Sequence, residues 1–122
     1  MSQTGLVISQ VEGVTIVMFR EAAILDMSAV EGISKDLYAL VDQQAIRKIV
    51  LDFSTVRFLS SQMIGVLIKL QAKAAAIKGR VVLCGLQGEL HKVFKITRLD
   101  KIMEFAPNED EAMNRLRGPG RT

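Results

Sequence analysis

The chain has 122 residues, 49% of them hydrophobic and 24% charged, with a formal net charge of +3. This length fits one domain that buries its own core, and the composition excludes a disordered chain. The single cysteine, Cys84, excludes an internal disulfide, and no clustered Cys and His residues offer a structural metal site.

The chain lacks the features of an exported or membrane protein. Its first twenty residues have no basic leader followed by an apolar core, and no uncharged apolar run approaches membrane-spanning length. We therefore expect a cytoplasmic protein with no membrane partner. The positive charge is modest and lies partly in residues 115–122, which argues against a nucleic-acid partner.

The first elements in chain order are a hairpin and a helix. Two β-branched runs, 6–11 and 14–19, flank Glu12-Gly13 and predict two antiparallel strands. After a connector over 21–27, Ser28 is expected to cap a helix, with Glu31 in the capping-box position. Apolar residues at helical spacing continue this helix to about residue 43.

A strand covered on both faces is predicted over 46–53 because its centre, Ile49-Val50-Leu51, is continuously apolar. Asp52 then lies at the carboxyl end of this strand, where open sheets with helical crossovers usually meet ligands and partners. Asp26 is expected to reach the same edge of the sheet.

Two adjacent serines, Ser60 and Ser61, stand where the next helix should begin. A serine before an amphipathic run is by default an N-cap, because its side-chain oxygen accepts a bond from one of the first unpaired amides. The same place can hold an anion, since unpaired N–H groups and the positive end of the helix dipole meet there. This helix is predicted over 61–78, with Gly79 as its left-handed C-terminal cap.

The faces of this helix differ in character. Met63 belongs to the core stripe, whereas Ile64 and Ile68 fall on its shoulder, where burial is favoured over a docking role. Gly65 costs roughly 1 kcal/mol relative to alanine inside a helix, which suggests the close approach of another backbone or of a partner. Lys69, Lys73, Lys78 and Arg80 form a basic stripe that is expected to be solvated.

The remaining pattern completes an α/β domain. A buried strand is predicted over 81–84, a short helix near 90–97, a strand over 102–105 and a helix over 109–116. Strands alternating with helices predict a mixed, mostly parallel sheet of about five strands with about four helices, the first strand being antiparallel at or near an edge. One domain over 1–117 and a disordered tail over 118–122 are expected.

Enzymatic chemistry finds little support in these residues. A nucleophilic Ser60 or Ser61 needs a base, and the sole histidine, His91, is expected on a solvated helix face. The serines also lack the flanking glycines of a hydrolase elbow, and no glycine-rich phosphate loop occurs. Asp26 and Asp52 supply too few oxygens for a hard cation. We expect no catalysis, metal or cofactor.

Several segments in this order and spacing resemble the STAS domain family, in particular bacterial anti-sigma factor antagonists. They span most of the chain and comprise Ile24-Leu25-Asp26, Ile49-Val50-Leu51-Asp52-Phe53-Ser54, Phe58-Leu59-Ser60-Ser61 with Gly65-Val66-Leu67, and Leu99-Asp100-Lys101-Ile102. The family motif, Asp-Ser-Ser/Thr-Gly-Leu-Gly, is altered here. Leu59 replaces the acidic residue, Gln62 and Ile64 replace the two glycines, and Gly65 is displaced by one position.

The resemblance implies a phosphorylation switch. It assigns the modified serine to Ser60, with Ser61 as the alternative, and it implies an anti-sigma factor serine kinase as partner and a phosphatase for reset. The unmodified chain would bind the kinase and release the sigma factor. The residues expected to contact the partner are Asp26, Leu59, Ser60, Ser61, Gln62, Met63, Ile64 and Ile68. Two alternatives are an unphosphorylated STAS scaffold in a signalling complex and a small anionic ligand at the same helix end.

Overall fold

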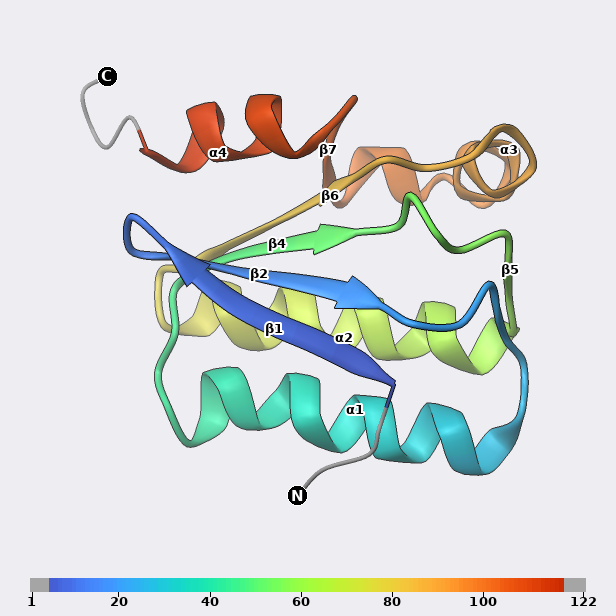
Figure 1. Ribbon diagram of the computed structural model, residues 1–122, viewed down its shortest axis with the longest axis horizontal. Helices are drawn as coiled ribbons and strands as arrows, with labels where there is room; N and C mark the ends of the chain where they lie inside the picture. The colour runs from blue at the N-terminus through green and yellow to red at the C-terminus, as the bar shows by residue number, and fades with distance from the viewer. Residues whose placement is uncertain (1–4, 118–122) are drawn as a thin grey trace.

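A five-stranded sheet forms the centre of the computed structural model, which describes residues 5–117. Its strands follow the order β1-β2-β4-β6-β7, with β1 antiparallel to β2 and the others parallel (Figure 1). This confirms the predicted mixed sheet with its hairpin at one edge. The expected tail over 118–122 lies outside the described residues. The strands are β1 (Leu6–Val11), β2 (Val14–Phe19), β4 (Lys48–Asp52), β6 (Arg80–Cys84) and β7 (Glu104–Ala106).

Helices cover both faces of this sheet. Two long helices, α1 (Met27–Asp42) and α2 (Ser61–Ala76), lie side by side on one face, and α4 (Glu109–Arg117) lies on the other (Figure 1). Because both faces are covered, the centres of β4 and β6 are buried along their whole apolar runs. Helix α3 (Gly88–Ile96) and the 3₁₀ helix η1 (Leu99–Lys101) connect β6 to β7. No helix within residues 5–117 is long and apolar enough to cross a membrane.

The end of α2 differs from the prediction that Gly79 takes the left-handed position. Lys78 has φ +61°, and its amide donates to the Ala75 carbonyl at 3.0 Å. The amide of Gly79 donates to the Ala74 carbonyl at 2.7 Å, which completes a Schellman motif. Gly79 is required for a different reason: a Cβ there would lie 2.7 Å from the Arg47 carbonyl oxygen.

Two lysines of the predicted basic stripe, Lys69 and Lys73, contact side chains of α1. Lys73 forms an ion pair with Asp42 at 2.8 Å, which ties α2 to α1. Lys69 and Lys73 also lie over the ring of Tyr38, 5.7 and 5.1 Å from its centroid. Both contacts join α2 to α1, but Lys69, Lys78 and Arg80 are exposed, as predicted, and Lys73 is half-buried.

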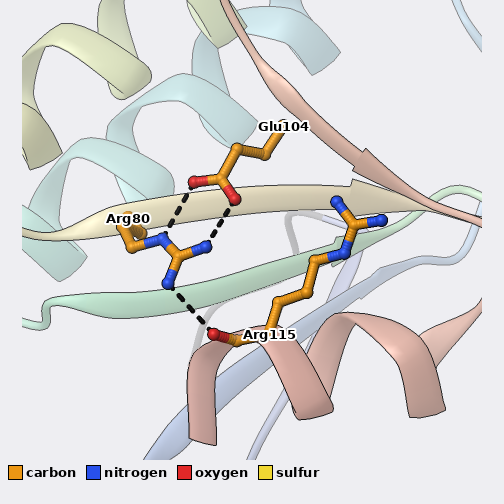
Figure 2. Close-up of polar contacts among 3 residues, drawn as sticks. All are labelled: Arg80, Glu104 and Arg115. Atoms are coloured by element: carbon orange, nitrogen blue, oxygen red, sulfur yellow. Dashed lines mark hydrogen bonds and ion pairs between the residues drawn. The ribbon is translucent and has the colours of Figure 1, made fainter. Parts of the chain in front are cut away.

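Arg80 lies on β6 instead of a helix face. Its guanidinium donates to both carboxylate oxygens of Glu104 on β7, at 2.6 and 2.9 Å (Figure 2). It also donates to the main-chain carbonyl of Arg115 on α4 at 3.0 Å, while the Arg115 side chain points away from it (Figure 2). Arg80 therefore joins the sheet edge to the helix that covers it.

A second, two-stranded sheet was not predicted. Strands β3 (Ala23–Ile24) and β5 (Phe58–Leu59) pair in parallel, and each directly precedes a long helix. Two residues are too few to show a period-2 pattern, so this β3–β5 ribbon leaves no signal in the sequence. It sets the position of the two helix starts described next.

Candidate functional site

Ser60 caps α2 at the end of the β3–β5 ribbon. Its amide donates to the carbonyl oxygen of Ile24 at 3.0 Å, which fixes the backbone in an extended conformation (φ −79°, ψ 162°). Its hydroxyl oxygen accepts from the amide of Met63 at 3.2 Å. The N-cap predicted from the sequence is thus confirmed as Ser60, and Ser61 is the first residue of the helix.

The start of α2 carries no built-in negative charge. Its first turn contains no acidic residue, and Leu59 precedes the cap and packs against the core. Ser60 is half-buried, whereas Ser61 and Gln62 are exposed. A helix N-terminus in this state favours an added anion, because the dipole and the first amides lack a charged partner.

The shoulder of α2 is only partly buried. Ile64 is half-buried against the core, and the side chain of Ile68 is 39% exposed. Met63, expected both in the core stripe and among the contact residues, is 0% exposed. A partner cannot reach Met63 directly, since its side chain fills the core beneath the Ser60 cap. The accessible shoulder is therefore Ile64 and Ile68.

Gly65 faces open space. A Cβ added there would meet no described atom within 4 Å, and the position is exposed. The expectation that a backbone of the same chain approaches Gly65 is therefore wrong for the described residues. The alternative, that Gly65 accommodates a partner, stays a prediction.

Two exposed apolar side chains near Ser60 were missed by sequence reasoning. Leu25 follows β3 and is 57% exposed, and Phe58 on β5 is 56% exposed. With Leu59 and with Val93 of α3, they line a cavity of about 240 Å³. The sequence offered a signal, since Leu25 and Phe58 lie within the segments that carry the family resemblance, but their exposure depends on the ribbon.

Asp26 caps α1, which corrects the expectation that Ser28 does so. The amide of Ala29 donates to the Asp26 carboxylate at 3.1 Å, and the hydroxyl of Ser28 donates to the same oxygen at 2.6 Å. These bonds, that from Ser28 above all, lower the pKa of the exposed Asp26. Ser28 therefore supports the capping carboxylate from inside the helix.

Asp52 does not join Asp26. It is 7% exposed, and its carboxylate accepts from the Ser54 amide at 2.8 Å. Burial acts to raise the pKa of Asp52, but hydrogen bonds from Glu109 and Ser54 outweigh it and lower the pKa. The pKa of Glu109 is raised to about 7 by its hydrogen bond to Asp52 and by burial. Glu109, at the start of α4, therefore keeps its proton to a higher pH than an ordinary glutamate, whereas Asp52 on β4 loses its proton more readily.

The described residues form neither a serine–histidine pair nor a group of metal ligands. His91 is exposed on α3 and lines a separate cavity of about 570 Å³ with Leu86 and Phe105. Ser60 is instead tied to Ile24 and Met63. Among the described residues, no group of three or more His, Cys, Asp or Glu side chains is placed to hold a metal ion.

Comparison with known proteins identifies the family. The model of the STAS domain family matches residues 6–112. This chain belongs to the STAS domain family. An anti-sigma F factor antagonist from Lysinibacillus sphaericus is 30% identical to it over 107 residues, 88% of each chain. The chain is therefore related to the anti-sigma factor antagonists within the STAS family.

Solved structures show the same STAS fold. The Bacillus cell fate determinant SpoIIAA in its phosphorylated form is 25% identical, with a TM-score of 0.71 over 92% of this chain and 99% of that chain. An anti-sigma factor antagonist from Mycobacterium paratuberculosis is 23% identical, with a TM-score of 0.80 over 96% of this chain and 99% of that one. Both similarities cover more than nine-tenths of this chain.

Proposed function

We propose that this STAS protein is a non-enzymatic anti-sigma factor antagonist that is switched off by phosphorylation at Ser60. Unmodified, it binds a serine-kinase anti-sigma factor in the cytoplasm and releases the sigma factor. The kinase transfers the γ-phosphoryl group of ATP to the Ser60 hydroxyl, which loses its proton, and ADP leaves. A phosphatase then hydrolyses the phosphate ester with water and restores the serine.

The observation that carries this proposal is the neutral, accessible cap of α2. The Ser60 hydroxyl accepts from an amide in the first turn of the helix and lies beside a mostly apolar, partly exposed surface. We call this surface the docking rim and define it as Leu25, Phe58, Leu59, Gln62, Ile64 and Ile68. The structure of SpoIIAA in its phosphorylated form supports the proposal, because it shows that a protein with this fold can carry a phosphate.

The physics of the switch separates folding from docking. A phosphate brings roughly −1.5 to −2 charges at neutral pH, and at a helix N-terminus these charges interact favourably with the dipole. The fold should therefore tolerate it. A partner that covers the docking rim must desolvate this charge, and a hundredfold loss of affinity needs only about 2.7 kcal/mol. One poorly paired buried phosphate supplies that cost.

A second candidate, a constitutive STAS scaffold, is favoured by one specific observation. Where the family motif has an acidic residue before the serine, this chain has Leu59, which is half-buried against the core. A kinase that recognises that carboxylate would find none in the first turn of α2. In the scaffold, the docking rim would bind its partner without any change at Ser60 or Ser61.

The substitution Ser60→Asp tests the switch. Aspartate retains the cap, so the urea midpoint of unfolding should stay within experimental error of the wild-type value. Affinity for the cognate anti-sigma factor, measured by calorimetry, should fall at least a hundredfold. The matched control is Gln44→Glu, which adds the same charge just after the C-terminal end of α1. This variant should bind as the wild type does.

Two results would count against the switch. Wild-type affinity in the Ser60→Asp variant would show that Ser60 is not part of the interface. A hundredfold loss of affinity in Ser61→Asp but not in Ser60→Asp would assign the switch to Ser61. Mass spectrometry of protein isolated from its native cell separates the two candidates. Ser60 and Ser61 that stay unmodified while the partner is bound and released favour the scaffold.

A further inference from the structure

We propose that β1 is a self-association edge, through which two copies of this chain pair antiparallel and join their sheets. Strand β1 lies at the edge of the five-stranded sheet and, among residues 5–117, pairs with β2 alone. All its residues after Leu6 are exposed, including Val7 at 43%, Ile8 at 42% and Val11 at 43%. This surface is separate from the Ser60 site, so the inference does not depend on the proposed switch.

The edge lacks the features that usually prevent strand pairing. Natural edge strands carry charged side chains, proline or a bulge that blocks a further strand. Strand β1 has the sequence Leu-Val-Ile-Ser-Gln-Val, without charge or proline, and pairs with β2 residue by residue from Leu6 to Val11. A regular, uncharged edge of six residues is therefore free to accept another strand.

The backbone groups that would pair can be assigned from the hairpin. The amide of Arg20 donates to the Gly5 carbonyl at 2.8 Å, so these two residues form a hydrogen-bonded pair across β1 and β2. Hydrogen-bonded and non-hydrogen-bonded pairs alternate in an antiparallel ladder. Val7, Ser9 and Val11 therefore direct their backbone groups toward β2, and Leu6, Ile8 and Gln10 direct theirs outward.

A second copy of β1 satisfies all these outward groups in one register. With the two-fold axis at Ile8, Ile8 lies opposite Ile8 of the second copy, and Leu6 lies opposite Gln10. Every outward N–H and C=O group then has a partner. A register centred on Ser9 would place Leu6 opposite Glu12, which lies in the turn with φ +52°. No charged side chain enters the strand pair in the register about Ile8, which is why we assign a second copy as the occupant.

Cysteine cross-linking tests this register. Directly opposed, hydrogen-bonded residues have Cα atoms about 5.5 Å apart, within the range that a disulfide spans. Mild oxidation of the full-length Ile8→Cys variant should give a disulfide-linked dimer on a non-reducing gel. The native Cys84 is 1% exposed, and burial above all raises its pKa to about 12, so it should remain unreacted.

Val7→Cys is the matched control, because Val7 and Ile8 are almost equally exposed. In the register about Ile8, the two Val7 Cα atoms would be roughly 8 Å apart, too far for a disulfide. Val7→Cys should therefore cross-link at least tenfold more slowly. Equal rates in the two variants would indicate random collision and overturn the proposal, as would the absence of a dimer in Ile8→Cys.

Sedimentation of the unmodified chain gives an independent test. The wild type should show a concentration-dependent dimer, and Ile8→Pro should be monomeric at every concentration. Proline at this position removes an outward N–H that β2 does not use, so the hairpin retains its own bonds. Circular dichroism should confirm that the variant is folded. A wild-type chain that stays monomeric at millimolar concentration would overturn the proposal and leave the edge open to a strand of another protein.

Discussion

Helices α1 and α2 begin next to each other, each directly after one strand of the β3–β5 ribbon, but their caps differ in charge (Figure 1). Helix α1 is capped by the carboxylate of Asp26, which the Ser28 hydroxyl supports. Helix α2 is capped by the neutral hydroxyl of Ser60. The first helix start carries its anion permanently, whereas the second has the same geometry without the charge.

This difference shows how one fold can separate stability from regulation. A charge that is always present serves only the fold, because it never changes between states. A neutral cap is adequate for the fold and leaves room for a charge that comes and goes. The ribbon ties both helix starts to one support, through the bond from the Ser60 amide to the Ile24 carbonyl. A phosphate at Ser60 would therefore be added at the one of these two helix starts that has no charged cap of its own.

The largest expected effect on the two starts comes from removing the caps. Ser60→Ala should lower the free energy of unfolding by about 1 kcal/mol, the usual cost of losing a hydroxyl cap. Asp26→Ala should lower it further, because the dipole also loses its charge and Ser28 loses its acceptor. Urea denaturation at neutral pH measures both. An Asp26→Ala variant that is as stable as Ser60→Ala would show that the charge contributes nothing to α1.

A somewhat smaller effect, of opposite sign, is expected at Gly65. Because an added Cβ meets no described atom within 4 Å, Gly65→Ala should raise the free energy of unfolding by about 0.5–1 kcal/mol. If a partner approaches the α2 start closely, the same substitution should weaken binding. Ala75→Gly, also exposed on α2, is the reverse control and should lower stability without affecting binding. A Gly65→Ala variant with unchanged affinity would remove Gly65 from the docking surface.

The sheet and the α2 cap could be predicted because their signals are repeated along the chain. Two β-branched runs on either side of Glu12-Gly13 predicted the hairpin, and the serine before an amphipathic run predicted the cap of α2. The burial of Met63 also followed from its place in the core stripe. These features depend on local pattern, which one sequence contains in full.

What could not be predicted depends on contacts between distant segments. Ser28 looked like a cap because it precedes a glutamate by three residues, but the β3–β5 ribbon starts α1 earlier and gives the cap to Asp26. Gly79 looked like a helix terminator, but the approach of Arg47 accounts for it. The pairing of Asp52 with Glu109 instead of Asp26 likewise depends on the fold of α4 against the sheet.

The smallest expected effect is a dependence on pH that only the α1 start should show. The pKa of Asp26 is lowered below the ordinary value of 3.8, chiefly by its bond from Ser28 and then by the Ala29 amide. A lowered carboxyl pKa means that the folded state prefers the charged form, so its stabilising contribution is present above the unfolded pKa and lost as the pH falls through the folded pKa. Asp26→Asn should therefore be less stable than the wild type at pH about 7, and this deficit should shrink at pH about 3. The deficit of Ser60→Ala should stay constant over the same range, since a hydroxyl does not titrate there. Urea midpoints of the three proteins at both pH values measure these deficits. If the Ser60→Ala deficit shrank in parallel with that of Asp26→Asn, the stability of the α2 start would also depend on a carboxylate, and the two helix starts would not differ in charge as described.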